Sequence, residues 1–132
     1  YMDGSVVLCG TDRVMAGAGM YYGENDPRNR SICLPNKVGY TNQVSETVGV
    51  KTAAEDTPIN NDLELVSNSR HVLNGLNGRF TKWEDEGYFL IGNSHVMETT
   101  IARFRAHTLL TKLRWVKGHS GDPENHGADC LA

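Results

Sequence analysis

Three acidic residues and one asparagine occupy positions where their side chains could support chemistry. Asp3 lies in an apolar and aromatic opening, residues 1–9, that is typical of a buried central strand. A carboxylate in such a strand is costly unless a cation or a hydrogen-bonding network stabilises it. Candidate partners for Asp3 follow at three later points of the chain, Glu46, Asn68 and Asp129.

Together these side chains predict a site for divalent cations. We expect Asp3 and Asn68 on neighbouring parallel strands about 5 Å apart, with Glu46 on a crossover helix and Asp129 on the last helix. Carboxylates from separate elements repel one another unless cations lie between them. Magnesium prefers hard oxygen ligands, and two ions about 4 Å apart can activate water and stabilise the leaving oxygen of a phosphodiester. Each acid alone is more often a structural hydrogen-bond acceptor, so the prediction depends on the joint pattern.

The composition is typical of one soluble globular domain. Of the 132 residues, 39% are hydrophobic and 22% are charged, which suits a compact domain with a core. No apolar run approaches the roughly 20 residues of a membrane helix, so we expect no membrane contact. The net charge of −3 does not by itself predict nucleic-acid binding, which would need a local patch or bound metal. We expect a monomer, and residues 1–132 to be a single domain of a longer protein.

The three cysteines, Cys9, Cys33 and Cys130, are widely spaced and form no CxxC pair. This pattern favours reduced, mostly buried thiols over a disulfide framework or a zinc site. No signal-peptide pattern opens the chain. We therefore expect an intracellular protein, in a compartment that the sequence does not specify.

Three strands joined by short turns are predicted in the first part of the chain, at residues 1–9, 16–23 and 29–34. The second of them, AGAGMYYG, has small residues that allow another backbone to approach closely. The elements expected after these strands are a helix capped by Thr41 and running to about Glu55, a strand at 63–67, a short helix at 70–76, a helix at 95–107, a strand at 109–116 and a helix that begins at Asp122-Pro123. The order predicts an α/β fold, a five-stranded mixed sheet with three antiparallel and then two parallel strands, flanked by helices.

These motifs, taken together and in order, resemble those of ribonuclease H, in particular of its eukaryotic type-1 family. The resemblance covers essentially the whole chain. It is carried by Asp3-Gly4-Ser5, by AGAGMYYG with Leu34-Pro35, by Thr41-Asn42-Gln43 before Glu46, by Ser67-Asn68-Ser69, and by Gly118-His119-Ser120-Gly121 with Asp129 ten residues after His119. It implies a ribonuclease H fold and a hydrolase that cuts the RNA strand of an RNA/DNA hybrid with two magnesium ions, which manganese can replace.

The resemblance also implies catalytic roles for individual residues. Asp3, Glu46 and Asp129 match metal ligands, and Asn68 occupies the position of a fourth ligand. His119, by default a surface-loop histidine, matches a mobile histidine that helps proton transfer and product departure. Gly118 and Gly121, which flank His119 and Ser120, would permit such movement.

A second group of residues matches positions that contact the hybrid. Asn42 and Gln43 match residues that reach the minor groove, where 2′-hydroxyls mark the RNA strand. We also expect Ser69 to contact the nucleic acid. Thr41 and Asn93 match a pocket that holds a phosphate of the DNA strand.

The segment 77–94 departs from the family pattern. Many members carry a basic, tryptophan-rich protrusion here, whereas this chain has the acidic run Glu84-Asp85-Glu86. Trp83 matches an aromatic residue along the DNA-strand channel, and core packing is an equally weighted interpretation. Gly39 occupies the position of an arginine in the phosphate pocket of animal enzymes. Both departures predict a weaker affinity for the hybrid, which a module elsewhere in a longer protein or a fused polymerase could compensate.

The largest departure is Asn68, because the family has an aspartate there. Asparagine has nearly the same shape but is neutral, and half of its head group is a donor. Two explanations are open. The substitution was introduced to hold an uncut substrate, which we favour, or the chain is a natural hybrid-binding module without catalysis. A further alternative, within the enzyme class, is that the chain is the ribonuclease H domain of a reverse-transcribing element, which would share every motif. We expect the chain as written to be nearly inactive.

Overall fold

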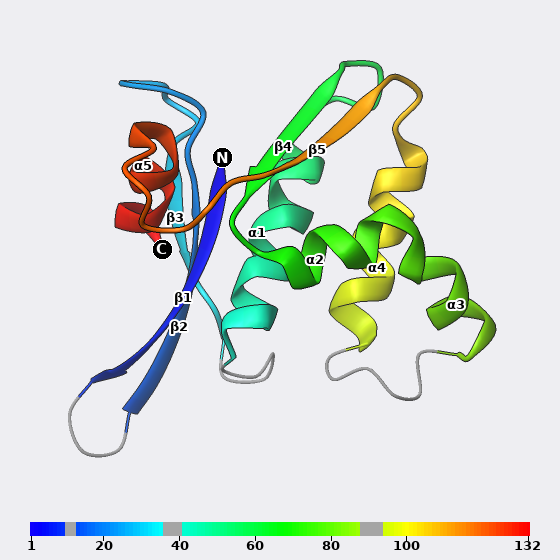
Figure 1. Ribbon diagram of the computed structural model, residues 1–132, viewed down its shortest axis with the longest axis horizontal. Helices are drawn as coiled ribbons and strands as arrows, with labels where there is room; N and C mark the ends of the chain where they lie inside the picture. Colours follow the sequence, from blue (N-terminus) through cyan, green and yellow to red (C-terminus); the bar gives the residue numbers. More distant parts are fainter. Residues whose placement is uncertain (10–12, 36–40, 88–93) are drawn as a thin grey trace.

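The computed structural model describes residues 1–9, 13–35, 41–87 and 94–132 of the chain. These residues fold around a mixed five-stranded sheet. The strand order is β3-β2-β1-β4-β5 (Figure 1). The first three strands are antiparallel, and β4 and β5 run parallel to β1. The strands are β1 (Met2–Cys9), β2 (Arg13–Met20), β3 (Arg30–Cys33), β4 (Leu63–Ser67) and β5 (Thr111–Trp115). The predicted α/β fold and strand arrangement are confirmed.

The helices are divided between the two sides of the sheet. They are α1 (Asn42–Asp56), α2 (Arg70–Asn74), the kinked segment η1 (Gly75–Arg79), α3 (Phe80–Asp85), α4 (Ser94–Ala106) and α5 (Pro123–Leu131). Figure 1 shows α5 on one side of β1 and β2, and α1, α2 and α4 on the other. Among the described residues, no helix combines the length and the hydropathy that spanning a bilayer requires.

The core lies between the central hairpin and α1. Met2, Ala18 and Met20 are buried on the strands and pack in one cluster with Val44 and Val50 of α1. Burial of each methionine or valine side chain in this cluster stabilises the fold by about 1.5–3 kcal/mol. Thr41 caps α1 as the sequence predicts, since its hydroxyl accepts a hydrogen bond from the Val44 amide at 3.2 Å.

Two glycines let helices approach the strands at backbone distance. A Cβ atom added at Gly4 of β1 would lie 2.4 Å from the Glu46 amide nitrogen of α1. One added at Gly19 of β2 would lie 2.2 Å from the Ala128 carbonyl oxygen of α5. The close approach expected from the small residues of the second strand is therefore present. It brings two helices that carry predicted site residues against the strand that carries Asp3.

The sheet is weakly joined at its centre. Over the described strands, β1 and β4 share a single register pair, Met2 opposite Ser67. By contrast, β4 pairs with β5 along its whole length, from Leu63 opposite Thr111 to Ser67 opposite Trp115. Figure 1 shows β4 and β5 turned away from the central hairpin. The end of β4 is thus positioned chiefly by β5.

Several predicted boundaries differ from the observed ones. The second strand was expected at 16–23 and occupies Arg13–Met20, because every residue from Arg13 onward pairs with β1. The chain then leaves the sheet, since Gly23 has a φ of +150° and the Tyr22 amide donates to Asn29 Oδ1 at 2.7 Å. The strand expected at 109–116 begins only at Thr111. The predicted turn at 10–12, the loop at 36–40 and Gly39 lie outside the described residues.

The segment after β4 is more helical than the sequence indicates. The helix predicted at 70–76 is α2, and it continues through η1 into α3 with a kink. At the kink Asn77 and Gly78 leave helical geometry, and Gly78 has a φ of +134°. A glycine tolerates that conformation, which is unfavourable for other residues. The helix predicted at 95–107 corresponds to α4.

The prediction of mostly buried thiols is wrong for two of the cysteines. Cys33 and Cys130 are both free and exposed. Cys33 lies on β3, an edge strand of the sheet, and Cys130 lies on an exposed part of α5. A small apolar side chain at an edge strand or on a terminal helix is not forced into the core.

The close contact at Gly19 yields a stability test. Gly19→Ala should lower the free energy of unfolding by roughly 1–3 kcal/mol, because the new methyl group meets backbone atoms of α5 that cannot rotate away. Ser31→Ala, on the neighbouring strand and exposed, should change it by less than about 0.5 kcal/mol. Urea unfolding of both variants measures the difference. Equal midpoints for the two would show that α5 adjusts freely.

Candidate functional site

Asp3 is a buried carboxylate with two hydrogen bonds. Its side chain is on β1 opposite Gly19, and the residue is only 5% exposed. Oδ1 accepts from the Gly4 amide at 2.7 Å, and Oδ2 accepts from Asn68 Nδ2 at 2.9 Å. Burial nevertheless raises the pKa of Asp3, and the charge of Asp129 raises it further. The hydrogen bonds therefore offset the cost of burying this charge only in part.

Glu46 approaches Asp3 from α1. Its Oε2 accepts a hydrogen bond of 2.5 Å from the Ser69 hydroxyl. Burial raises the pKa of Glu46, and repulsion from the Asp3 carboxylate raises it as well. Ser69 also caps α2 by accepting from the Val72 amide at 3.4 Å. One serine thus links the start of α2 to the acid on α1.

Asp129 reaches the same region from α5, where it contacts His119. The distance between Asp129 Oδ2 and His119 Nδ1 is 3.5 Å, which is an ion pair only when the imidazole is protonated. The His119 side chain is 81% exposed, and its φ is +51°. Asp122 caps α5 and Pro123 is in its first turn, as predicted. The loop before α5 thus leaves the imidazole in solvent beside a carboxylate.

Asn68 follows the last residue of β4 and faces Asp3, as the sequence predicts. Its Nδ2 donates to Asp3, and its backbone carbonyl accepts from the Trp115 indole at 3.0 Å. A Cβ added at Gly118 would be 3.1 Å from Asn68 Nδ2, so the loop after β5 packs against this amide. The contact from Trp115 was missed in the sequence. An aromatic residue in a strand indicates packing, and nothing in the sequence indicates which carbonyl its N–H meets.

The donor chemistry of this cluster fits a divalent cation. Asp3, Glu46 and Asp129 offer carboxylate oxygens, which magnesium prefers, and rotation of the Asn68 amide would offer a fourth oxygen. Burial first, and the charge of a neighbouring acid second, raise the pKa values of Asp3 and Glu46, and a bound cation would offset both effects. In the described part of the chain, however, no three His, Cys, Asp or Glu side chains are gathered closely enough to hold one ion. Metal ligation by these residues stays a prediction.

The residues expected to contact a hybrid have varied surroundings. Asn42 and Gln43 are exposed in the first turn of α1. Thr41 is exposed but its hydroxyl caps the helix. Trp83 is half-buried and lies over Gly75, where an added Cβ would be 2.8 Å from its ring, so packing accounts for part of its surface. Asn93 lies outside the described residues.

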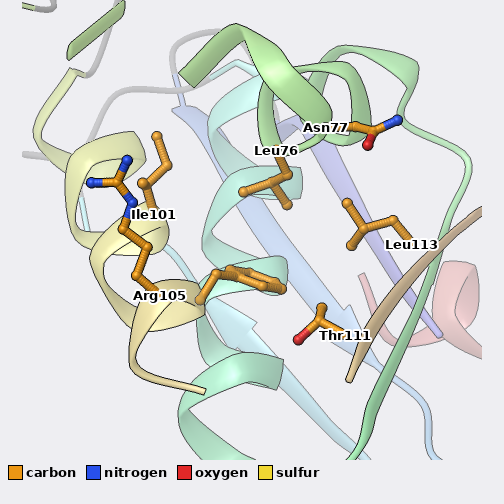
Figure 2. A pocket seen from close by; sticks show the side chains of 7 residues that line it. Leu76, Asn77, Ile101, Arg105, Thr111 and Leu113 are labelled. Atoms are coloured by element: carbon orange, nitrogen blue, oxygen red, sulfur yellow. The ribbon is translucent and has the colours of Figure 1, made fainter. Parts of the chain in front are cut away.

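A separate cavity of about 370 Å³ lies between α4, η1 and β5 (Figure 2). Its walls are mostly apolar, with Arg105 at one side. The lining residues are Leu76, Asn77, Ile101, Phe104, Arg105, Thr111 and Leu113. None of them is a predicted site residue, so this cavity is distinct from the acidic cluster.

Comparison with known proteins gives consistent matches over the whole chain. A family model described as RNase H matches residues 1–132. The chain is 34% identical over 136 residues to a ribonuclease H of Schizosaccharomyces pombe, covering all of this chain and 50% of that protein. It is 32% identical over 139 residues to ribonuclease H1 of Homo sapiens, covering all of this chain and 47% of that protein. The chain therefore spans about half the length of these curated relatives.

A solved structure shows the same fold. The crystal structure of LC9-RNase H1, described as a type 1 RNase H with the type 2 active-site motif, superimposes with a TM-score of 0.74. The match covers all of this chain and 68% of that one at 20% sequence identity. At this identity the likeness supports the fold alone.

The repulsion between Glu46 and Asp3 should give stability a defined pH dependence. A carboxyl group whose pKa is raised by folding contributes stability below its unfolded pKa, and this contribution is lost as the pH rises through the folded value. Glu46→Gln keeps an acceptor for Ser69 but removes the charge. Its free energy of unfolding should exceed that of the unchanged chain by a few tenths to about 1 kcal/mol at pH 7 without divalent ions.

The gain from Glu46→Gln should disappear below pH 4, near the ordinary carboxyl pKa values of 3.8 and 4.5. Urea unfolding between pH 3.5 and 8 measures it. Glu98→Gln, at an exposed position of α4, is the matched control and should show no such trend. A pH-independent difference for Glu46→Gln would contradict the electrostatic origin.

Proposed function

The chain belongs to the ribonuclease H family, and from that premise we propose that its acidic cluster is a nuclease site for the RNA strand of RNA/DNA hybrids, impaired here by Asn68. The observation that carries the proposal is that the buried Asp3 carboxylate of β1 accepts a hydrogen bond from the Asn68 amide and lies within electrostatic reach of Asp129 of α5 and Glu46 of α1. No two of these acids share a secondary-structure element.

Asp3, Glu46, Asn68 and Asp129 would hold two magnesium ions. The bound ions would supply the Lewis acidity that lowers the pKa of water and the charge that stabilises the departing 3′-oxygen. Asp3 is held in place by the Gly4 amide, and Glu46 by the Ser69 hydroxyl. Hydrogen bonds to the ligands of a metal site fix the orientation of those ligands.

Asn68 would weaken this site in two ways. It lacks one negative charge, and its Nδ2 donates to Asp3 Oδ2, so a donor faces the oxygen that a cation would need. His119 would exchange protons with solvent and the product, since it is exposed and only 3.5 Å from Asp129. Neither role requires a change of fold.

The hybrid would lie across the acidic cluster and the start of α1. Asn42 and Gln43 are exposed in the first turn of α1, and hydrogen-bonding groups of this type suit the minor groove with its 2′-hydroxyls. Ser69 is buried and engaged with Glu46, so it would act through that acid more than through direct contact. Thr41 would hold the helix end through its cap.

A second function is favoured by the Asn68–Asp3 hydrogen bond. That bond satisfies the buried carboxylate with a neutral donor, which is a stable arrangement for a module that binds hybrids without cutting them. The two functions differ in what restoring an acid at residue 68 would do.

Restoring that acid should restore cleavage. Asn68→Asp should cut the RNA strand of a labelled RNA/DNA hybrid with magnesium at least roughly 100-fold faster than the unchanged chain. Asn60→Asp, an exposed change of the same chemistry, should leave the rate at the level of the unchanged chain. If Asn68→Asp binds the hybrid and does not cut it, the non-catalytic module is the correct function.

The same substitution should couple stability to magnesium. Asn68→Asp loses the hydrogen bond to Asp3 and adds a like charge, so without divalent ions it should unfold with roughly 1–3 kcal/mol less free energy than the unchanged chain. Millimolar magnesium should recover most of this loss by binding the native state. Thermal unfolding with and without magnesium measures the effect. Equal recovery in Asn60→Asp would indicate non-specific ion binding.

A further inference from the structure

Trp115 contacts the end of β4 from two directions. It is the last residue of β5 and pairs with Ser67, the last residue of β4. Its indole N–H donates to the Asn68 carbonyl at 3.0 Å, and the Arg70 guanidinium carbon lies 4.2 Å from the centre of its ring. One side chain therefore holds residues on both sides of Ser69.

The position of Asn68 needs such a contact because the central sheet does not supply it. The pair Met2–Ser67 is the single described register pair between β1 and β4, and Asn68 lies just beyond it. No ladder of strand hydrogen bonds therefore fixes Asn68 against Asp3. The Val116 amide bonds to the Ser67 carbonyl at 3.1 Å, so the chain after β5 continues to follow β4 up to this point.

Core packing does not account for Trp115. The residue is 42% exposed and lies outside the buried cluster around Met2 and Leu65. A tryptophan with an exposed face and a satisfied N–H gains its stability from the hydrogen bond and from stacking with a cation. Both of these contacts are with the segment that carries Asn68.

We propose that Trp115 is a positioning residue of the acidic site, which fixes the backbone at residue 68 so that its side chain faces Asp3. Trp115 acts through the Asn68 carbonyl and need not touch a substrate. The part of the proposal that concerns metal and cleavage rests on the proposed function. The part that concerns the Asn68–Asp3 contact does not.

The metal-free chain provides the first test. Trp115→Phe removes the N–H and keeps an aromatic face for Arg70. Nuclear magnetic resonance of the Asn68 side-chain amide should show roughly fivefold faster exchange with water, because the hydrogen bond to Asp3 opens more often. The control is Tyr22→Phe, which removes a hydrogen bond of 3.1 Å to Asp56 and should leave Asn68 unchanged.

The second test uses the Asn68→Asp background. There, Trp115→Phe should weaken magnesium binding, measured by calorimetry without nucleic acid, by roughly 10-fold. It should lower kcat for hybrid cleavage at subsaturating magnesium and leave KM for the hybrid unchanged. Tyr22→Phe in that background should alter neither quantity.

The outcomes separate the two proposals. Equal amide exchange in Trp115→Phe and Tyr22→Phe would refute the positioning role, whatever the cleavage results. Faster exchange in Trp115→Phe alone, in a chain whose Asn68→Asp variant does not cut, would support the positioning role and reject the nuclease. Faster exchange with weaker magnesium binding and lower kcat would support both.

Discussion

Contact between helix backbone and strand backbone is the constraint on which the acidic cluster depends. At Gly4 and Gly19 an added Cβ would come within 2.4 Å and 2.2 Å of atoms in α1 and α5. A larger residue would move either helix away from the hairpin, and with it Glu46 or Asp129. The two glycines lie on opposite faces of the sheet, so acids from both sides approach the buried carboxylate of Asp3. Packing thus enforces a proximity of like charges that electrostatics alone would oppose.

The limited backbone pairing between β1 and β4 is a second constraint on the geometry of the site. Because the two strands share one described register pair, the contact between the end of β4 and the site residues of β1 is made by side chains, although backbone pairing joins β4 to β5. Asn68 bonds to Asp3, Ser69 bonds to Glu46, and the Asn68 carbonyl bonds to Trp115. These contacts connect β4 to β1, α1 and β5 respectively. The region with the weakest backbone pairing is therefore the one where polar side chains determine the geometry.

The sequence predicted the elements whose patterns are local. The strand at 63–67, the Thr41 cap and the Asp122 cap are confirmed, as is the family resemblance. The predictions were wrong where contacts between distant segments determine the structure. The start of β2 depends on pairing with β1, and the kink at Gly78 depends on a backbone angle. The exposed Cys33 reflects an edge position that only strand order reveals. The acids Asp3, Glu46 and Asp129 could be proposed as site residues from their types, their spacing and the family resemblance, whereas the hydrogen bond of the Trp115 N–H could not be predicted.

Asn68 shows why the fold and the activity have to be judged separately at this site. In the folded chain its amide donates to Asp3, which is the kind of stabilisation that a buried carboxylate needs. An aspartate in its place would repel Asp3 and would require a cation for the same relief. Without a bound cation the fold therefore favours asparagine over aspartate at residue 68, and only chemistry that depends on the cation would favour aspartate. Asn68 lowers the electrostatic cost of burying Asp3 because it lacks the negative charge that would attract a metal ion.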